Sequence, residues 1–187
     1  MMGATNLDKV AFRKQQIQKM TQMQAQTQAE SAQLTQQLFQ TSAWQKARSI
    51  ATTISSPIEV NTRQLITQAL KDGKQVLLPK TMPHRQMAFL PFDDQYDQLV
   101  VSKFGIPEPA YDAALVNQTP DLVIVPAIAF DCQTCNRIGF GAGYYDRFLA
   151  GYHGATVALV PTVMQYDAAQ WPLEEHDIKI NQLILCH

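Results

Sequence analysis

Apolar residues recur at near-helical spacing in the opening part of the chain and then gather into short, separate runs. The first group consists of Leu7, Val10, Phe12, Ile17 and Met20. Because Pro and Gly are absent from residues 4–56, this spacing predicts a helical region over residues 6–50. Within it, Ser31 is expected to cap a second helix that carries Leu34, Leu38 and Phe39.

Farther along the chain, predicted strands alternate with predicted helices. The β-branched run 49–55 suits a strand, and Asn61 or Thr62 is placed to cap a helix that Gly73 closes. Apolar runs predict further strands at 75–78, 86–90, 122–125, 155–160 and 183–185, and a helix at 144–150. Pro79 is expected to stop the strand before it. This order favours an α/β fold with a mostly parallel central sheet and helices on both faces.

Polar groups follow three of the predicted strands. Glu59 comes after the first, Lys80 after the second, and a glycine-rich segment after the strand that ends at Val125. Ligands of open parallel sheets bind beyond the carboxyl ends of strands. We therefore expect a ligand site here, in a single domain over residues 1–187 whose helical N-terminal part is 1–48.

Composition narrows the class of protein. Of the 187 residues, 46% are hydrophobic and the formal net charge is −1, which is typical of a globular protein and not of a nucleic-acid binder. The longest apolar run is too short to span a bilayer, and the N-terminus has no apolar signal-peptide core. We expect a cytoplasmic monomer that binds neither nucleic acid nor membrane.

Two features of composition leave alternatives open. Cys132-x-x-Cys135 has the spacing of a metal or redox site, but zinc needs four ligands and no second pair is present, so loop thiols are favoured. Twelve glutamines lie between Gln15 and Gln45. They indicate a solvated helical face more than an interaction coil, because sustained heptads are absent.

The segment from Arg137 to Arg147 holds the densest chemistry in the sequence. It reads RIGFGAGYYDR and follows a predicted buried strand. Glycines let a backbone approach a ligand closely, and amide groups at a helix start attract phosphate. The spacing matches neither the P-loop nor the dinucleotide-binding pattern. The glycines alone are therefore also compatible with a plain strand-to-helix turn.

Charged and aromatic neighbours favour the anion site. Arg137 is suited to a bidentate contact with phosphate. Asp146 is expected in the first turn of the helix, where the helix dipole favours a negative charge. It is also suited to bind Mg²⁺ together with phosphate oxygens. Tyr144 and Tyr145 offer flat faces to a ring system. Asp177 either completes a metal shell or belongs to an ordinary exposed acidic turn.

Several motifs together resemble the 5-formyltetrahydrofolate cyclo-ligase family. The glycine-rich motif RIGFGAGYYDRFL, preceded by residues 121–126 and 129–131, is highly specific. Weaker matches fall in the expected order along the chain: Lys9-x-x-x-Arg13-Lys14, Ile54-Ser55, Glu59-Val60 with Thr62, Leu78-Pro79, Met87-x-Phe89, residues 105–109 and Glu175-His176-Asp177.

The resemblance implies a three-layer α/β/α sandwich and an enzyme that uses ATP and Mg²⁺. Members of the family convert 5-formyltetrahydrofolate to 5,10-methenyltetrahydrofolate and release ADP and phosphate. In the implied mechanism the formyl oxygen attacks the γ-phosphate, N10 attacks the resulting iminium phosphate, and phosphate leaves. The expected cofactor is Mg²⁺, and the expected partners are a reduced folate and ATP.

The resemblance also implies roles for the matched residues. Arg137 and Tyr145 are expected to be catalytic, and Asp146 and Asp177 to hold Mg²⁺. ATP is expected to contact Lys9, Val10, Ala11, Phe12, Arg13, Arg137, Ile138, Gly139, Phe140, Gly141, Ala142, Gly143, Tyr144 and Tyr145. The folate is expected to contact Ile54, Glu59, Phe140, Gly141, Ala142, Gly143 and Tyr144. Glu59 would accept paired hydrogen bonds from the aminopyrimidine edge of the pterin.

The sequence departs from the family pattern at a few positions. Thr53 stands where an aromatic residue is common, and Ala127 and Asn181 replace a common Gly and a frequent Asp. None of these changes removes a proposed phosphate or metal group. The alternative function is a non-catalytic folate- or phosphate-binding module on the same fold. Retention of Asp146 and Asp177 favours the enzyme, because a pure binder has little need for two metal carboxylates.

Overall fold

The N-terminal region is helical, as predicted, but it is divided at Met23. A computed structural model describes residues 8–186 of the chain, so the expectations for residue 6 and Leu7 lie outside the described residues. Its first elements are α1 (Lys9–Gln22), α2 (Gln24–Phe39) and α3 (Ser42–Lys46). The side chain of Asp8 caps α1 by accepting a hydrogen bond from the amide of Ala11 at 2.7 Å.

The predicted cap at Ser31 is wrong. Ser31 lies inside α2, where its hydroxyl donates to the carbonyl of Thr27 at 2.8 Å and accepts from the amide of Asn61 at 3.0 Å. A serine inside a helix commonly bonds the carbonyl one turn earlier. Ser31 therefore joins α2 to the segment before α4 (Arg63–Lys71) and starts no helix.

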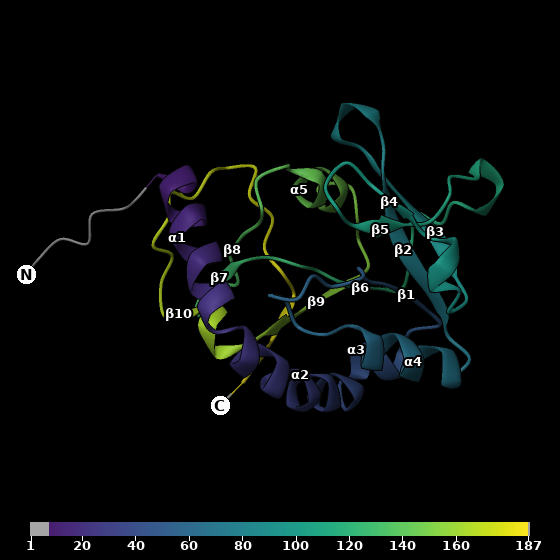
Figure 1. Cartoon of the computed structure of the whole chain (residues 1–187), viewed down its shortest axis with the longest axis horizontal. Coiled ribbons are helices and arrows are strands. Elements are labelled where there is room, and N and C mark those ends of the chain that lie inside the picture. Colours follow the sequence, from purple (N-terminus) through teal and green to yellow (C-terminus); the bar gives the residue numbers. More distant parts are fainter. Residues whose placement is uncertain (1–7, 187) are drawn as a thin grey trace, which may run out of the picture.

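A six-stranded sheet forms the centre of the fold, with strand order β11-β9-β6-β1-β2-β3 (Figure 1). Its strands are β1 (Ser49–Ala51), β2 (Gln75–Thr81), β3 (Met87–Phe92), β6 (Leu122–Ile124), β9 (Ala155–Val160) and β11 (Gln182–Leu185). Every neighbouring pair is parallel except β2 and β3, which form an antiparallel hairpin at one edge. The predicted mostly parallel sheet is therefore confirmed.

Pro79 does not end its strand, contrary to the prediction. β2 runs on to Thr81, and Pro79 pairs with Phe89 of the antiparallel partner. The register with β1 stops at Leu77, so beyond that point β2 has β3 as its only neighbour in the sheet. Proline is tolerated there because one side of the strand no longer needs an amide donor. Lys80 consequently lies within β2 and not after it.

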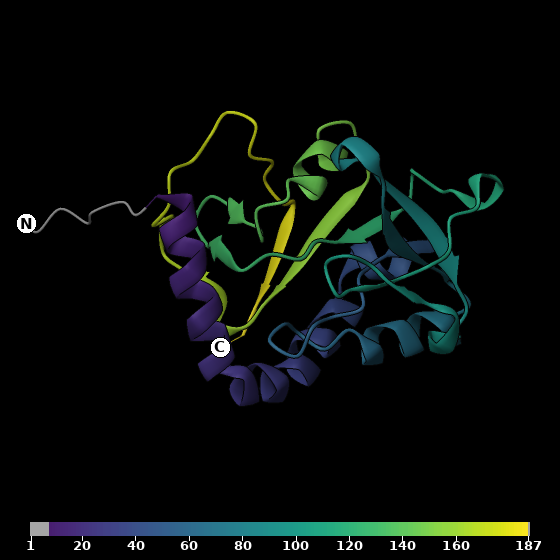
Figure 2. The same cartoon turned by 45° about the horizontal axis from the view of Figure 1, so that its top comes forward.

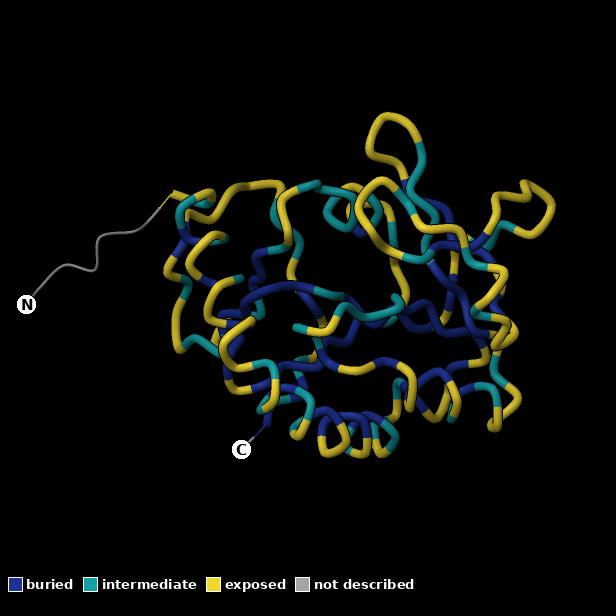
Figure 3. Tube along the Cα trace, viewed as in Figure 1, coloured by how far each residue is buried: buried dark blue, intermediate teal, exposed yellow. Residues whose placement is uncertain are grey.

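Helices cover both faces of the sheet (Figure 2). Side chains of neighbouring residues in one strand point to opposite faces. Leu77 belongs to the cluster that includes Met20 of α1 and Leu149 of α5 (Tyr144–Leu149). Leu78 belongs to the cluster formed with α2, α3 and α4. Figure 3 shows the buried strands between more exposed helices and loops. This arrangement agrees with the expected α/β/α layers.

Short elements lie outside the central sheet. They are the three-stranded sheet β10-β7-β8, made of β7 (Ala129–Asp131), β8 (Arg137–Ile138) and β10 (Gln165–Tyr166), the hairpin of β4 (Val100–Val101) and β5 (Pro107–Glu108), and the 3-10 turns Pro83–Arg85, Tyr96–Gln98, Ala113–Leu115 and Thr162–Met164. The glycine-rich segment therefore begins in β8 and does not follow β6 directly. Within residues 8–186, no helix is both long enough and apolar enough to cross a membrane.

Candidate active site

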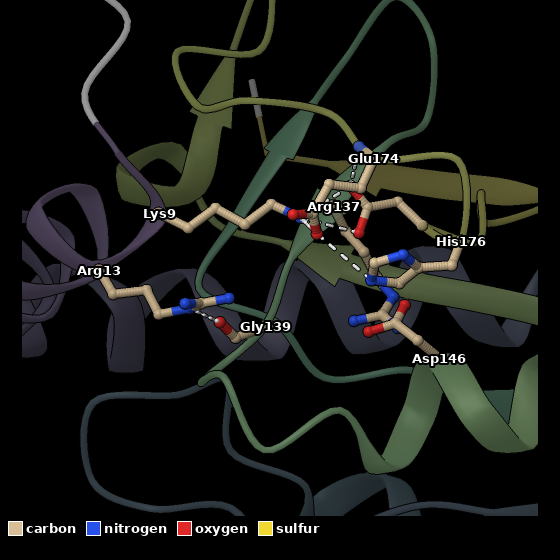
Figure 4. Close-up of polar contacts among 8 residues, drawn as sticks. Lys9, Arg13, Arg137, Gly139, Asp146, Glu174 and His176 are labelled. Atoms are coloured by element: carbon tan, nitrogen blue, oxygen red, sulfur yellow. Dashed lines mark hydrogen bonds and ion pairs between the residues drawn. The ribbon is translucent and has the colours of Figure 1, made fainter.

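The glycine-rich segment folds so that a strand residue meets a helix residue. Arg137 on β8 pairs with Phe130 of β7, and its side chain is almost fully buried. The chain turns through Gly143, which caps α5 at a φ of 74°. Asp146 in the first turn of α5 then accepts a hydrogen bond from Nη2 of Arg137 at 2.6 Å (Figure 4). This partly buried ion pair links the two ends of the loop.

Two glycines of the loop allow arginine side chains to lie against its backbone. A Cβ atom at Gly139 would lie 3.3 Å from Nη1 of Arg137. A Cβ atom at Gly141, where φ is 106°, would lie 3.3 Å from Cζ of Arg13. Nε of Arg13 also donates to the carbonyl of Gly139 at 2.9 Å. The loop thus holds two guanidinium groups, one from α1 and one from β8, against its backbone.

Lys9 joins the N-terminal helix to the acidic C-terminal run. Its Nζ atom donates to Oε2 of Glu174 at 2.7 Å and to both carboxylate oxygens of Asp177 at 3.0 Å. His176 lies beside the same cluster, with Nε2 3.2 Å from Glu174. Burial lowers the pKa of Lys9, but the hydrogen bonds and charges of the two carboxylates outweigh it, so the pKa is raised.

The other residues expected to follow Lys9 at the ATP site lie on different sides of α1. Phe12 is buried against Tyr166 and Trp171, with ring centroids at 5.5 and 5.0 Å. Val10 is 74% exposed. Only Lys9 and Arg13 make the contacts with the C-terminal run and the glycine-rich loop that are described above. A one-turn spacing on a helix explains this, because residues four apart share a face.

Arg137 lies among several charged and polar groups. Burial lowers its pKa, while the charges of Asp146, Tyr145 and Asp177 raise it, and the net shift is downward. Its Nε atom is buried and has no hydrogen-bond partner within residues 8–186. A buried donor without a partner is costly unless a ligand supplies the acceptor. Nε of Arg137 is therefore available to an incoming anion.

Tyr145 carries a second unpartnered polar atom. Its hydroxyl is buried and has no hydrogen-bond partner among the described residues. Burial raises its pKa, the positive charge of Arg137 works against that shift, and Glu59 adds to it. The hydroxyl thus interacts electrostatically with both Arg137 of the glycine-rich loop and Glu59, which follows β1.

Glu59 lies in an open depression beyond the carboxyl ends of β1 and β6. Its Oε2 atom accepts hydrogen bonds from the amide of Ser56 at 2.9 Å and from the Ser56 hydroxyl at 2.6 Å. Burial raises the pKa of Glu59, against the effect of these two bonds. The lining residues are Thr52, Thr53, Ser55, Glu59, Val60, Thr62, Ile124, Val125, Pro126, Ala127, Leu159 and Met164. Ile54 is not among them and packs on the core cluster of α2 to α4.

The two carboxylates expected to hold Mg²⁺ pair with two different basic side chains. Asp146 accepts from Arg137, and Asp177 accepts from Lys9. The described residues include one group whose ligand atoms lie within 4.8 Å of one another, namely Glu174, His176 and Asp177. Asp146 is not part of that group. The contact of Glu174 with Lys9 was missed by the sequence reasoning, and only the repeated acidic residues of this run hinted at it.

Other expected contact residues lie along the loop itself. Phe140 is 47% exposed, Tyr144 is half-buried at the start of α5, and Ala142 lies between two glycines with positive φ. Cys132 and Cys135 are half-buried free thiols in the turn between β7 and β8. They lie outside the group of candidate metal ligands in residues 8–186.

Comparisons with known proteins agree with this architecture. The model of the 5-formyltetrahydrofolate cyclo-ligase family matches residues 6–186. A probable 5-formyltetrahydrofolate cyclo-ligase of Schizosaccharomyces pombe is 31% identical over 128 residues, which cover 66% of this chain and 62% of that protein. The 5-formyltetrahydrofolate cyclo-ligase of Escherichia coli K12 is 31% identical over 145 residues, which cover 74% of this chain and 78% of that protein.

A solved structure extends the likeness to three dimensions. The NMR structure of Aquifex aeolicus 5,10-methenyltetrahydrofolate synthetase superimposes with a TM-score of 0.79 at 26% identity, covering 95% of this chain and 89% of that one. A Mycoplasma pneumoniae 5,10-methenyltetrahydrofolate synthetase, at 19% identity and a TM-score of 0.65, shares the fold.

Proposed function

Because the chain belongs to the 5-formyltetrahydrofolate cyclo-ligase family, we propose that the cluster around Arg137 is where it activates its substrate with ATP. The protein is an ATP-dependent ligase of folate one-carbon metabolism. It converts 5-formyltetrahydrofolate to 5,10-methenyltetrahydrofolate with release of ADP and phosphate. The observation that carries the site assignment is the buried Arg137, whose Nε donor has no partner within residues 8–186.

The ATP phosphates are assigned to the space between α1 and the glycine-rich loop. Phosphoryl transfer depends on positioning and on positive charge more than on covalent help from the protein. Lys9 and Arg13 supply that charge from α1, and Arg137 supplies it from β8. Backbone amides between Ile138 and Tyr145 are available to cradle phosphate oxygens. Val10 to Phe12 would contribute mainly by placing the two basic residues.

The reduced folate is assigned to the neighbouring depression. Glu59 would accept hydrogen bonds from the aminopyrimidine edge of the pterin, and its existing bonds to Ser56 fix the carboxylate in position. Phe140 to Tyr144 would form the wall between the folate and ATP. Ile54 would flank this site, because it packs on the core cluster that supplies the lining residues Val60, Ile124 and Leu159. Thr53 lines the depression as a small polar residue.

The reaction transfers phosphate to an oxygen of the substrate. The formyl oxygen attacks the γ-phosphorus, and the bond to ADP breaks with its electron pair going to ADP. The N10 lone pair then attacks the former formyl carbon, phosphate leaves with the carbon–oxygen electron pair, and N10 loses its proton. Arg137 would stabilise charge on the transferred phosphoryl group. The hydroxyl of Tyr145, which has no partner within residues 8–186, would lie between the two substrates and donate a hydrogen bond to one of them.

The donor set around Arg137 is compatible with Mg²⁺. Asp146 and Asp177 are carboxylates, the ligands that Mg²⁺ takes together with phosphate oxygens. Glu174 and His176 lie close enough to Asp177 to support it. When bound, the ion would neutralise phosphate charge, and Lys9 and Arg137 would then be released from these carboxylates to contact the nucleotide.

We propose that the protein is a single domain and works as a monomer. Sedimentation of the purified protein across a range of concentrations, with and without ATP, tests this assignment. An oligomer that forms at assay concentrations and is needed for turnover would contradict it.

The decisive experiment separates the ligase from a non-catalytic folate- or phosphate-binding module. Purified protein, 5-formyltetrahydrofolate, ATP and Mg²⁺ are mixed, and methenyl product is followed by absorbance while ADP is quantified. We expect product and ADP in equal amounts. Tight folate binding without product would instead identify a binding module.

A further inference from the structure

A short hairpin lies beside the site without a role in the assignments above. Its strands β4 and β5 stand next to α5 in Figure 1. Glu108 fixes the base of this hairpin to β2, because its carboxylate is 2% exposed and accepts from the Thr81 hydroxyl at 2.9 Å. Nζ of Lys80 lies 3.3 Å from the same carboxylate. The hairpin is therefore anchored at its base to the central sheet.

The tip of the hairpin is an ordered turn and not a loose loop. The amide of Ser102 donates to the carbonyl of Ile106 at 2.8 Å, and the amide of Gly105 donates to the carbonyl of Ser102 at 2.9 Å. Gly105 has a φ of 74°, which closes the turn without strain. Phe104 is thereby held in a defined position at the tip.

Phe104 contacts the glycine-rich segment, and about half of the residue stays exposed. Its ring centroid lies 5.9 Å from that of Tyr144, with the planes at 80°. The side chain is 47% exposed, and the neighbouring Ile106 is 39% exposed. An edge-to-face pair fixes the ring but covers only part of its surface. The contact leaves an aromatic face open beside a residue assigned to the folate.

We propose that Phe104 is a further positioning residue of the folate site and contacts the p-aminobenzoyl ring of the substrate. This inference rests on the proposed function. The depression with Glu59 and the wall at Tyr144 account for the pterin, but the ring attached to N10 has no assigned contact. Phe104 is a suitable occupant for that contact, because aromatic rings favour offset or edge-to-face packing with one another.

The position matters because N10 is the nucleophile of ring closure. Rotation about the bonds between the pterin and N10 moves the lone pair toward or away from the activated formyl carbon. A contact that holds the adjacent aromatic ring restricts that rotation and favours attack. Without it, water competes with N10: its oxygen adds at the activated carbon, phosphate leaves, and 5-formyltetrahydrofolate is regenerated. One ATP is then hydrolysed without product.

Lys103 adds a charge where the substrate continues beyond its aromatic ring. Its Nζ atom lies 5.1 Å from the centroid of Phe104. The p-aminobenzoyl ring is followed by a glutamate, whose carboxylates an exposed ammonium group would attract. Phe104 and Lys103 at the tip thus complement the aromatic ring of the substrate and the negatively charged glutamate that follows it.

Phe104→Ala tests the proposal through the coupling of the two products. In wild-type protein, methenyl product and ADP should form in equal amounts. In the variant we expect ADP in clear excess over product and a KM for 5-formyltetrahydrofolate raised about three- to tenfold, with the KM for ATP unchanged. Phe104→Tyr should keep the wild-type ratio, because it retains the ring.

Two further arms keep the result interpretable. Val100→Ala, at the base of the same hairpin and 55% exposed, should leave both the ratio and the KM unchanged. Binding of a 5-formyltetrahydropterin that lacks the p-aminobenzoylglutamate should be equal in wild type and Phe104→Ala.

An unchanged ratio and KM in Phe104→Ala would overturn the inference while leaving the ligase function intact. Absence of product from the wild type would overturn the proposed function instead. Concentration-dependent dimerisation that Phe104→Ala abolishes, with kinetics unchanged, would assign the exposed ring to a second copy of the chain and would also overturn the inference.

Discussion

At the scale of single residues, the hydroxyl of Tyr145 is expected to lower the stability of the protein while it increases the activity. It is buried without a hydrogen-bond partner within residues 8–186, so removing it relieves a desolvation cost. We expect Tyr145→Phe to raise the free energy of unfolding by roughly 1 kcal/mol and to lower kcat about a hundredfold. Denaturant unfolding and the methenyl assay measure the two quantities.

Tyr152→Phe is the matched control for Tyr145. The hydroxyl of Tyr152 donates to the carbonyl of Pro120 at 2.7 Å, so its loss should reduce stability and leave kcat unchanged. A Tyr145→Phe variant that is less stable than wild type, or fully active, would contradict the role given to this hydroxyl.

Gly141 links the backbone of the loop to the arginine of α1. At its φ of 106° an alanine would be strained, and its Cβ atom would press on Cζ of Arg13 at 3.3 Å. We expect Gly141→Ala to lower the free energy of unfolding by roughly 1–3 kcal/mol and to raise the KM for ATP. Gly151→Ala is the control, because a Cβ atom there meets nothing within 4 Å. Equal behaviour of the two variants would exclude a special role for Gly141.

At the scale of elements, α1 docks through polar contacts with parts of the chain far from it. Nε2 of Gln16 donates to the carbonyls of Ile128 and Val163 at 2.8 and 2.9 Å, and its Oε1 atom accepts from the hydroxyl of Tyr166 at 2.6 Å. Lys9 adds its bonds to the acidic run at one end of the helix. These contacts make the helix one wall of the proposed phosphate site.

Lys9→Met should therefore change nucleotide binding more than stability. A partly exposed ion pair contributes roughly 1 kcal/mol or less, and that share should shrink further in high salt. We expect a small loss of unfolding free energy and a KM for ATP raised at least about tenfold. Lys14→Met, on an exposed position of the same helix, should change neither. A wild-type KM in Lys9→Met would remove this residue from the ATP site.

Asp131, the last residue of β7, makes the free energy of unfolding depend on pH. Asp131 is 4% exposed, and burial raises its pKa. Hydrogen bonds from Thr134, Gln133 and Ala169 outweigh burial and hold the pKa below the ordinary value. Because the folded-state pKa is depressed, this stabilisation is present above the unfolded-state value near pH 4 and is lost as the pH falls through the folded-state pKa.

Asp131→Asn tests this term. We expect the variant to be less stable than wild type by roughly 1–2 kcal/mol at pH 7 and the difference to shrink toward pH 3. Denaturant unfolding at several pH values measures it. A difference that stays constant over this range would show that packing, and not the charge of Asp131, stabilises the turn.

The predictability of the elements followed from their length. The runs at 75–78, 86–90 and 155–160 consist largely of β-branched and apolar residues and are long enough to predict strands. Each of them forms a strand of the central sheet. β7 and β8 were not predicted, because they are too short to show a period and, unlike the equally short β6, each includes a charged residue. The end of β2 was misjudged because Pro79 is tolerated only by virtue of where β1 stops, which the local sequence does not contain.

At the scale of the whole molecule, the sequence predicted the layered α/β fold, and the family model and solved structures agree with it. The roles of the individual site residues remain predictions. Local chemistry pointed to Arg137 and Asp146, which are nine positions apart. It could not show that Lys9 meets Glu174, because that contact spans 165 positions and exists only after α1 docks.

The contact between Lys9 and Glu174 has a consequence for folding during synthesis on the ribosome. At about 5–20 residues per second, the partner of Lys9 is made roughly 8–33 seconds after it, since 165 positions separate the two. A helix forms in microseconds or less, so α1 must wait, folded or fraying, with Phe12 and Met20 uncovered. Long-range closure of this kind slows folding and makes the nascent helix a natural client for chaperones.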